Sequence, residues 1–415
     1  MSECDCSIHE TVELMPFEGA LELLLSHARR VEQSEVVALP DCLGRVLAET
    51  VSSGVTMPPW DNSAMDGYAV NSADLSLEHM SLPVSQRIPA GVQGAPLAAG
   101  TAARIFTGAP IPENADTVVI QEQCELHGAR VVIKQLPPVG ANIRRAGEDT
   151  REGEEVLGPG IRLEPQHLGL LASVGVAWLK VYRRLKVAIF SSGDELIMPG
   201  RPLAPGQIYN SNVFTLAGLL EQIGCEVVDL GIVKDTYQAT CDALRSAAEH
   251  SDLIMTSGGV SVGEEDHIKP AVETLGHLDL WKIAIRPGKP LAFGHIGKVP
   301  FIGTPGNPVS LFVTYCLFAR PFILRMQGVT GSLAPRAVTA KINCDWTRPD
   351  KRREFARARM ELDEQGEEWV SIFPNRSSGV LNSLAWANGL AVLPEGRLLS
   401  RGDVVRFLPF SELLR

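Results

Sequence analysis

The sequence lacks the features of a protein that binds nucleic acid or crosses a membrane. Lysine and arginine number 38 against 49 aspartate and glutamate residues, which gives a net charge of −11. Such an excess of acid is unfavourable for contact with nucleic acid or an anionic membrane. The longest apolar runs, 168–179 and 309–319, are too short to span a bilayer and predict buried helices. We therefore expect neither nucleic acid nor a membrane as a partner.

The sequence is also poor in paired cysteines and in the patterns of common catalytic sites. Its eight cysteines form no disulfide framework and no basic-then-apolar leader is visible, so we expect a cytoplasmic protein. The nine histidines are scattered and fit no metal spacing. Gly258 and Gly263 have the spacing of a phosphate-binding loop, but Glu264 and Glu265 stand where that loop needs lysine and serine or threonine. This excludes an ordinary nucleotide-triphosphatase loop, and an anion bound here needs positive charge from elsewhere.

What the chain does have is a long region of alternating strands and helices. A length of 415 residues predicts about two to four domains. The alternation at 185–327 predicts a mainly parallel sheet with helices on both faces. Strands are expected at 186–190, 226–233, 253–256, 281–285, 291–293 and 301–302, and helices at 211–223, 237–250, 266–275 and from 308.

Other regions flank this alternation. Short β-rich pieces between proline and glycine turns predict a small antiparallel domain at 54–145, and β texture after 333 predicts a barrel or sandwich. Helical spacing at 15–50 and 164–175 predicts a helical region that the β-rich domain interrupts. The predicted fold is a multidomain α/β-plus-β protein. Its domains are a discontinuous N-terminal domain (1–53 and 146–182), an insertion (54–145), an α/β domain (183–330) and a C-terminal β-barrel (331–415).

Carboxylates gather at the expected carboxyl ends of the strands, where ligands of such sheets bind. Each carboxylate alone is equally well explained as a helix cap. As a group they favour Mg²⁺, which takes one or two carboxylates together with water and substrate phosphate. The group consists of Asp194, Glu195, Asp235, Glu264, Glu265 and Asp266. We expect Glu195 and Asp266 to be metal ligands and Asp235 to be a weaker candidate.

Positive charge is expected close to these carboxylates. Lys282 and Arg286 are predicted on one face of a strand, with Lys289 just beyond a Pro-Gly turn. A single lysine at a strand end is usually solvated surface, but three cations together favour an anion pocket. A further basic segment at 336–359 has eight lysine and arginine residues against three acidic ones, and alone is equally well explained as a solvated hairpin.

Two loops have residues that let the backbone approach an anion. Ser257, Gly258 and Gly259 leave backbone N–H groups accessible. In the Gly-Thr-Pro-Gly-Asn-Pro loop, Pro305 and Pro308 fix the backbone, and the following asparagine-to-proline step predicts an Asn307 cap on a helix. The dense turn at 58–68 leaves its role open from composition alone.

Seven segments together resemble the MoeA/gephyrin E-domain family, the molybdopterin molybdenumtransferases. They span most of the chain in order, and the combination is highly specific. The segments are DNSAMDGYAV (61–70), RIFTGAPIP (104–112), NIRRAGED (142–149), FSSGDEL (190–196), TSGGVSVGEED (256–266), KIAIRPGKPLAFG (282–294) and GTPGNPVS (303–310).

The resemblance implies a molybdopterin-binding α/β fold and a Mg²⁺-dependent enzyme that inserts molybdate into adenylylated molybdopterin, releasing AMP. It implies a homodimer with a shared active site, in which Asp66 and Thr107 act on the cleft of the other subunit. The molybdopterin adenylyltransferase and apo-molybdoenzymes are further partners to consider. The functional positions carried over are Asp66, Thr107, Arg144, Glu195, Asp235, Asp266, Lys282, Arg286, Lys289, Pro305, Pro308, Arg357 and Ser378.

Roles for these positions follow from the implied substrates. Molybdate is a dianion that needs convergent donors, for which we expect Arg357, Lys282, Arg286 and Ser378. Two alternatives remain: adenylylation of molybdopterin by a related α/β domain, and a non-enzymatic scaffold. The additional N- and C-terminal domains favour insertion over adenylylation, and the lack of a second α/β module disfavours the scaffold.

Overall fold

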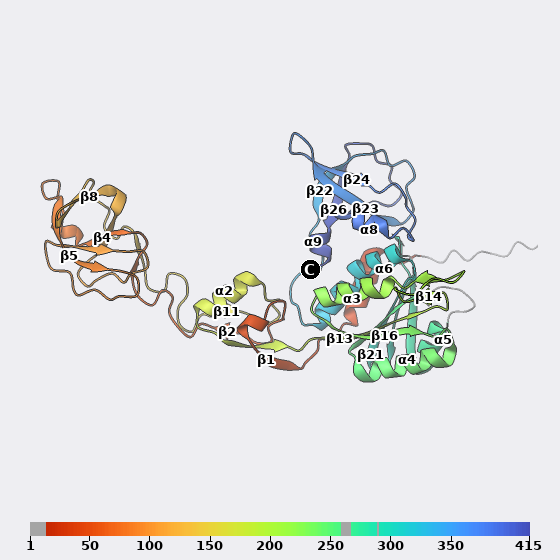
Figure 1. Cartoon of the computed structure of the whole chain (residues 1–415). Helices are drawn as coiled ribbons and strands as arrows, with labels where there is room; N and C mark the ends of the chain where they lie inside the picture. Colours follow the sequence, from red (N-terminus) through yellow and green to blue (C-terminus); the bar gives the residue numbers. More distant parts are fainter. Residues whose placement is uncertain (1–13, 259–266, 289) are drawn as a thin grey trace, which may run out of the picture.

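The computed structural model describes residues 14–258, 267–288 and 290–415. Figure 1 shows an extended molecule with a β-rich unit at one end, a smaller connecting unit, and an α/β unit beneath a β-barrel at the other end. This arrangement confirms the predicted multidomain α/β-plus-β fold, while the domain boundaries stay a prediction.

The α/β unit is built on a six-stranded sheet of order β16-β13-β17-β21-β20-β18. The first four strands of this order run parallel to one another, whereas β20 and β18 are antiparallel. The prediction of a mainly parallel sheet is therefore confirmed. The strands are β13 (Lys186–Ser192), β16 (Glu226–Val233), β17 (Leu253–Ser257), β18 (Gly276–Lys282), β20 (Pro290–Ile296) and β21 (Val299–Thr304).

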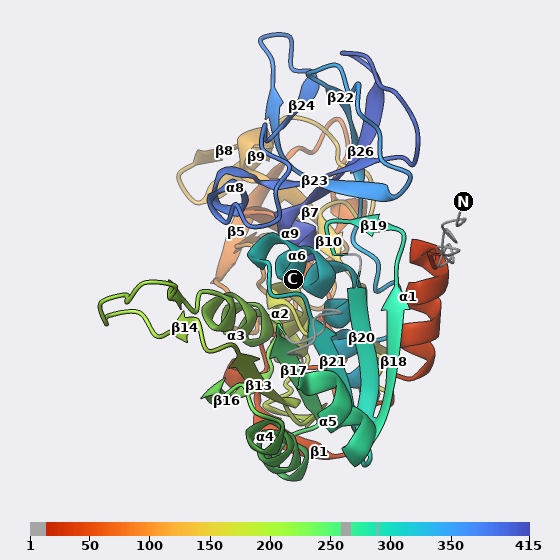
Figure 2. The same cartoon turned by 90° about the vertical axis from the view of Figure 1, so that its right-hand side faces the viewer.

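Helices cover both faces of this sheet because successive strand residues point to opposite sides. In β13, Val187 and Ile189 pack with α1 (Phe17–Ser26), α3 (Asn212–Gln222) and the helix from Pro308. Ala188 and Phe190 point the other way, toward α4 (Tyr237–His250) and α5 (Ile268–Leu275). Figure 2 shows α4 and α5 on the side of the sheet away from the barrel.

One described helix, Pro308–Met326, is long and apolar enough to cross a membrane, but 94 % of its apolar window is buried inside the protein. It consists of α6 (Pro308–Thr314), a π-helical turn (Tyr315–Ala319) and α7 (Arg320–Met326). Its side chains pack in the core of the α/β unit. The prediction of a buried helix at 309–319 is thus confirmed.

The β-rich insertion is a six-stranded sheet of order β7-β4-β6-β5-β9-β8. It is antiparallel except for the β5–β6 pair, which is parallel. Its strands are β4 (Gly67–Val70), β5 (Ser81–Ile88), β6 (Ala102–Ile105), β7 (Thr117–Ile120), β8 (Cys124–His127) and β9 (Arg130–Ile133), with 3-10 turns η2 (Ser72–Asp74) and η3 (Gln121–Gln123). The two-residue strands β3 (Asn62–Ser63) and β10 (Ile143–Arg144) pair beside it.

The connecting unit is formed by segments from both sides of the insertion. β1 (Ser34–Ala38) pairs with β12 (Trp178–Tyr182), and β2 (Val51–Ser52) pairs with β11 (Glu155–Leu157). Among the described residues of this unit, the only α-helix is α2 (Pro165–Ser173). α1, which we expected in the same unit, instead packs in the core of the α/β unit through Ala20 and Leu24.

Two helix predictions in this part of the chain are wrong. Within the region 15–50, where helical spacing was expected, the segment 39–48 contains only a 3-10 turn, η1 (Leu39–Asp41), that follows β1. The apolar run 168–179 is divided between α2 and β12. Both errors have one cause: pairing of β1 with β12 is a tertiary contact that overrides local helical spacing.

The C-terminal unit is a barrel closed by five strands in the ring order β23-β24-β22-β26-β25. A sixth short strand, β19 (Ile285–Arg286), comes from the α/β unit and pairs with β23. The barrel strands are β22 (Val338–Ile342), β23 (Arg353–Leu362), β24 (Glu368–Ile372), β25 (Gly389–Leu393) and β26 (Val404–Pro409), with helices α8 (Asn382–Trp386) and α9 (Phe410–Leu413).

Candidate functional site

A cavity of about 790 Å³ lies where the carboxyl ends of the parallel strands meet the barrel. The α/β unit contributes the loops after β13, β17, β19 and β21, and the barrel contributes the loops before β23 and after β24. This is the end of the sheet at which ligands of such folds bind. The lining residues are Glu195, Ile208, Gly258, Arg286, Pro287, Gly288, Pro290, Pro305, Gly306, Asn307, Ser310, Arg352, Arg376, Ser377 and Ser378.

The structure brings five of the predicted site residues into this cavity: Glu195, Gly258, Arg286, Pro305 and Ser378. They come from loops far apart in the sequence, and both the α/β unit and the barrel supply them. Gly259, Asp266 and Lys289 lie outside the described residues, as do Glu264 and Glu265.

The two glycine loops of the α/β unit are packed against each other. Asn212 donates from Nδ2 to Ser257 Oγ (2.8 Å) and to the Gly306 carbonyl (2.7 Å), and so links the loop after β17 to the loop after β21. The Gly258 N–H donates to the Thr304 carbonyl at 3.0 Å, and its φ of +87° requires glycine. Both loops are therefore held in place beneath the cavity.

The N-terminus of α6 differs from its predicted cap. Asn307 occupies the cap position, but its side chain makes no capping hydrogen bond. Instead, the Val309 N–H donates to the Ser378 carbonyl of the barrel at 3.0 Å. A tertiary contact thus replaces the local cap, and it fixes Ser378 beside Pro305 and Pro308.

The prediction of one continuous strand at 281–285 is wrong, because Lys282 and Arg286 lie in two different strands. β18 ends at Lys282, while Arg286 lies in β19 and pairs with Glu354 of the barrel. Lys282 and Arg286 therefore do not share one strand face, and only Arg286 lines the cavity. The reason is that the strand after Lys282 leaves the α/β sheet and joins the barrel.

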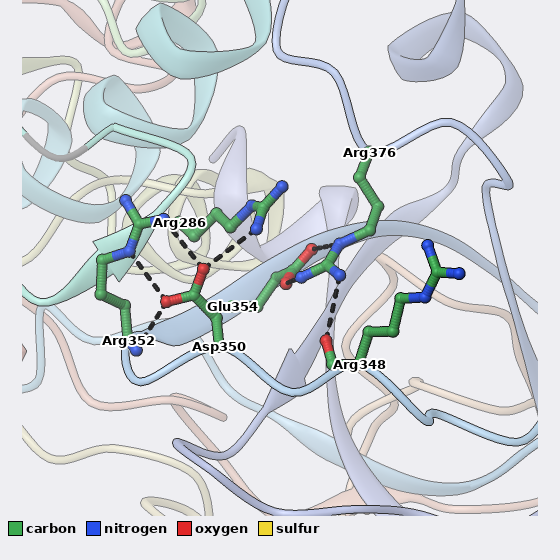
Figure 3. A network of polar contacts seen from close by, with 6 residues as sticks. All are labelled: Arg286, Arg348, Asp350, Arg352, Glu354 and Arg376. Carbon is green, nitrogen blue, oxygen red and sulfur yellow. Dashed lines mark hydrogen bonds and ion pairs between the residues drawn. The ribbon is translucent and has the colours of Figure 1, made fainter.

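Two lining arginines, Arg352 and Arg376, were missed by the sequence reasoning at the level of single residues. With Arg286 they form a cationic wall of the cavity. Figure 3 shows these three arginines and the carboxylates beside them. The basic segment at 336–359 was a signal for Arg352, but it did not show which of its eight cations turns toward the site. For Arg376, the sequence held no signal beyond its place two residues before Ser378.

Arg357 is placed differently from its prediction as a ligand of molybdate. Its side chain is 3 % exposed and does not line the cavity. It donates from Nε to Ser383 Oγ (3.0 Å) and from Nη2 to the Asn375 (2.6 Å) and Ser377 (3.1 Å) carbonyls. Burial lowers the pKa of the Arg357 guanidinium. In this structure Arg357 holds the 375–378 loop from behind.

The carboxylates near the cavity fit Mg²⁺ held largely by substrate and water. Glu195 is exposed and lines the cavity, and Asp235 accepts a hydrogen bond from Ser192 Oγ at 3.1 Å. No group of three or more metal-ligating side chains occurs among the described residues. One or two carboxylates with open positions for water and phosphate are the usual donor set for Mg²⁺.

Asp66 and Thr107 form a pair in the β-rich insertion. Asp66 Oδ1 accepts hydrogen bonds from the Thr107 N–H (2.8 Å) and Oγ1 (2.7 Å), and the N–H bond is the main reason that the pKa of Asp66 is lowered. Arg144 lies in β10 of the same end of the molecule. In Figure 1 this unit lies at the opposite end from the α/β unit, so one chain alone does not bring these residues to the cavity.

Comparison with known proteins gives matches along most of the chain. Three family models match: "MoeA N-terminal region (domain I and II)" at 15–175, "Probable molybdopterin binding domain" at 188–325 and "MoeA C-terminal region (domain IV)" at 339–410. A molybdopterin molybdenumtransferase of Haemophilus influenzae is 40 % identical over 404 residues, covering 97 % of this chain and 100 % of the relative. The chain belongs to the molybdopterin molybdenumtransferase family.

Other matches support the same membership in this family of enzymes. A molybdopterin molybdenumtransferase of Nostoc is 38 % identical, over 91 % of this chain and 89 % of the relative. The crystal structure of a molybdopterin biosynthesis protein from Pyrococcus horikoshii superposes with a TM-score of 0.80 at 29 % identity, covering 96 % of this chain and 100 % of that chain. The family recognised in the sequence is thus confirmed.

Each family model covers some of the candidate site residues. The model at 188–325 covers the sheet and the loops that carry Glu195, Gly258, Arg286 and Pro305, and the model at 339–410 covers the barrel with Ser378. The model at 15–175 covers the insertion with Asp66 and Thr107.

Proposed function

We propose that the protein inserts molybdate into adenylylated molybdopterin, releasing AMP and forming molybdenum cofactor. The observation that carries this proposal is the cavity between the α/β unit and the barrel, which Arg286, Arg352 and Arg376 line together with Glu195. A pyrophosphate and a molybdate dianion need such positive charge. Fixed cations also stabilise the charge that develops as the P–O bond breaks.

The metal in this proposal is Mg²⁺, held by Glu195 with Asp235 and Asp266 as further candidates. Bound there, it would neutralise phosphate charge in the cavity. Among the protein's own residues, Arg286 and Ser378 would bind the anions, and Lys282 and Lys289 would add positive charge. Ser257, Gly258 and Gly259 would approach the phosphate through their backbone. Pro305 and Pro308 would fix the neighbouring loop.

We also propose a cytoplasmic homodimer with a shared active site. Asp66, Thr107 and Arg144 lie in the insertion, which is at the opposite end of the molecule from the α/β unit and its cavity (Figure 1). If they act in the reaction, a second subunit must bring them to it. The molybdopterin adenylyltransferase and apo-molybdoenzymes are the partners expected to deliver the substrate and receive the product.

The proposal is tested by incubating the protein with adenylylated molybdopterin, molybdate and Mg²⁺ and measuring AMP. We expect AMP release that requires molybdate and stops when Mg²⁺ is chelated. ATP consumption with unmodified molybdopterin would instead support the adenylyltransferase alternative, and neither activity would support a scaffold. The names of the curated relatives favour the first outcome.

A further inference from the structure

The arginines of the cavity wall are held from behind by two carboxylates. Figure 3 shows Asp350 between Arg286 and Arg352, and Glu354 beside Arg376. Neither carboxylate lines the cavity, whereas all three arginines do. The carboxylates therefore contact the guanidinium groups on the side away from the space where an anion would bind.

Asp350 accepts more hydrogen bonds from these arginines than Glu354 does. Its Oδ2 accepts from Arg286 Nη1 at 3.0 Å and from Arg352 Nη2 at 2.9 Å. Its Oδ1 accepts from Arg352 Nε and from the Arg352 backbone N–H, both at 3.0 Å. The bonds from Arg352 are the main reason that the pKa of the Asp350 carboxyl is well below its usual range, so the group is charged at neutral pH.

The sharing of one oxygen by two guanidinium groups has a geometric consequence. Arg286 comes from β19 of the α/β unit and Arg352 from the loop before β23 of the barrel. Two like charges repel at such short range. The Asp350 carboxylate offsets this repulsion and keeps both cations side by side while the cavity holds no anion.

A second buried carboxylate, Glu354, holds the third arginine of the wall. Glu354 is 3 % exposed and accepts from Arg376 Nε at 3.1 Å and from Arg376 Nη2, while Arg376 Nη1 donates to the Arg348 carbonyl at 3.0 Å. A forked pair of this kind fixes the plane of the guanidinium as well as its position. Each arginine of the wall is thus oriented before a ligand arrives.

We propose that Asp350 is a positioning residue that holds Arg286 and Arg352 together as one binding site for a tetrahedral oxyanion. It acts through the two arginines and does not touch the ligand. The inference rests on the proposed function for the identity of the anion, which is either molybdate or a phosphate group of the adenylylated substrate. Without Asp350, an incoming anion must first bring two mutually repelling cations together, so that part of its binding free energy is lost.

The test compares wild type with Asp350→Asn, which keeps the size of the side chain but places an NH₂ group opposite guanidinium N–H donors. Binding of molybdate and of AMP is measured separately by isothermal titration calorimetry at fixed ionic strength. We expect the Kd of at least one anion to rise about tenfold or more. The anion that loses affinity identifies the ligand of the arginine pair.

Charge alone predicts the opposite sign, which makes the experiment decisive. Removing a negative charge near the cavity would tighten anion binding if Asp350 did no more than neutralise its neighbours. A lower Kd, or an unchanged Kd for both anions, would overturn the proposal, as would a wild type that binds neither anion. A KM for molybdate that rises with little change in the thermal midpoint would support positioning over a general structural role.

Two further variants serve as controls. Asp363 is another barrel aspartate held by several hydrogen bonds, from the Gln365 and Glu367 N–H groups and Trp369 Nε1, but it lies outside the cavity lining. Asp363→Asn should leave both anion affinities unchanged. If Asp350→Asn does not fold, Asp350→Glu provides a second test, because it keeps the negative charge but moves the carboxylate away from the position at which one oxygen reaches both guanidinium groups.

The binding measurements also separate this inference from the proposed function. They require no turnover, so a wild type that binds the anions but releases no AMP would contradict the proposed reaction alone. Loss of affinity in Asp350→Asn would still support the role of Asp350 in that case.

Discussion

The turn after β13 determines where the Glu195 carboxylate lies. Gly193 has a φ of +152°, and a methyl group at this position would lie 2.5 Å from Glu195 Oε2 and 2.8 Å from Oε1. The carboxylate is therefore folded back over a residue that has no side chain. The φ of +152° favours glycine, and a side chain here would have to displace the flexible end of Glu195.

We predict that Gly193→Ala lowers activity without abolishing folding. The added methyl group pushes the Glu195 carboxylate away from its position, and a misplacement of about 1 Å can cost on the order of 100-fold in rate. The rate of AMP release at saturating substrate and the Mg²⁺ concentration needed for half-maximal rate are the measurements.

Gly200 provides the matched control for this variant. It has a φ of +93° in the loop between β14 (Leu196–Ile197) and β15 (Ile208–Tyr209), and a methyl group there would have no atom within 4 Å. Gly200→Ala therefore introduces backbone strain without moving Glu195. An equal loss of AMP-release rate in Gly193→Ala and Gly200→Ala would show that backbone strain, and not the position of Glu195, lowers the activity.

At the scale of elements, an ion pair fixes the connection between the connecting unit and the α/β sheet. Arg183, between β12 and β13, donates from Nη1 and Nη2 to the two oxygens of Asp252 at 2.6 and 2.7 Å. The Lys186 N–H donates to the same carboxylate at 2.8 Å. Burial raises the pKa of Asp252, but the bonds from Arg183 and Lys186 outweigh it, and the net shift is downward.

A lowered pKa gives this contact a defined pH dependence. The stabilisation is fully present above the unfolded pKa of about 3.9 and is lost as the pH falls through the lower folded value. We predict that Asp252→Asn lowers the free energy of unfolding by about 1–3 kcal/mol at neutral pH, because charge-assisted hydrogen bonds are lost. The difference in thermal midpoint from wild type should shrink in strongly acidic buffer.

The Arg245–Asp242 pair on α4 is a suitable comparison. Its side chains are more than half exposed, and such surface pairs contribute little. Asp242→Asn should leave the thermal midpoint almost unchanged at either pH. A difference for Asp252→Asn that stays constant with pH would contradict the assigned role of the charge.

At the scale of the whole molecule, the separation of the insertion from the cavity has a direct functional consequence. Asp66 and Glu195 belong to two units that lie at opposite ends of the molecule in Figure 1. A shared site in a homodimer would take Asp66 from one subunit and Glu195 from the other. Each defect would then affect a different half of the site.

We predict that Asp66→Ala and Glu195→Ala proteins are inactive alone and recover activity when their subunits are exchanged. Random mixing should restore roughly a quarter of the wild-type rate, because half of the dimers are mixed and each mixed dimer has one intact site of two. The measurement is AMP release after unfolding and refolding the two proteins together.

Mixing Asp66→Ala with Thr107→Ala is the control. These residues bond to each other within one insertion, so a mixed dimer contains no intact pair and should stay inactive. Mixed dimers of Asp66→Ala and Glu195→Ala that form but show no activity would exclude the shared site.

Much of the fold was predictable because its local signals agree with its tertiary contacts. The predicted helix at 237–250 and strand at 226–233 have the bounds of α4 and β16, since amphipathic spacing and β-rich runs there match the faces that the sheet buries. The prediction failed where pairing with a strand distant in the sequence determines the secondary structure. The segment 39–48 follows a strand that pairs with β12, and 281–286 leaves one sheet to join another.

For the site, the residue types and the loops that carry them could be read from the sequence. Alternating strands and helices place Glu195, Gly258 and Pro305 at one edge of the sheet, and the motifs indicate the family. Which cations face the cavity depends on the folded structure. Arg357, Arg352 and Arg376 belong to one barrel, yet the first is buried behind a loop while the other two line the space, because the strand register and the carboxylates of Asp350 and Glu354 set their directions. Side-chain direction of this kind depends on contacts between distant segments, which no local pattern contains.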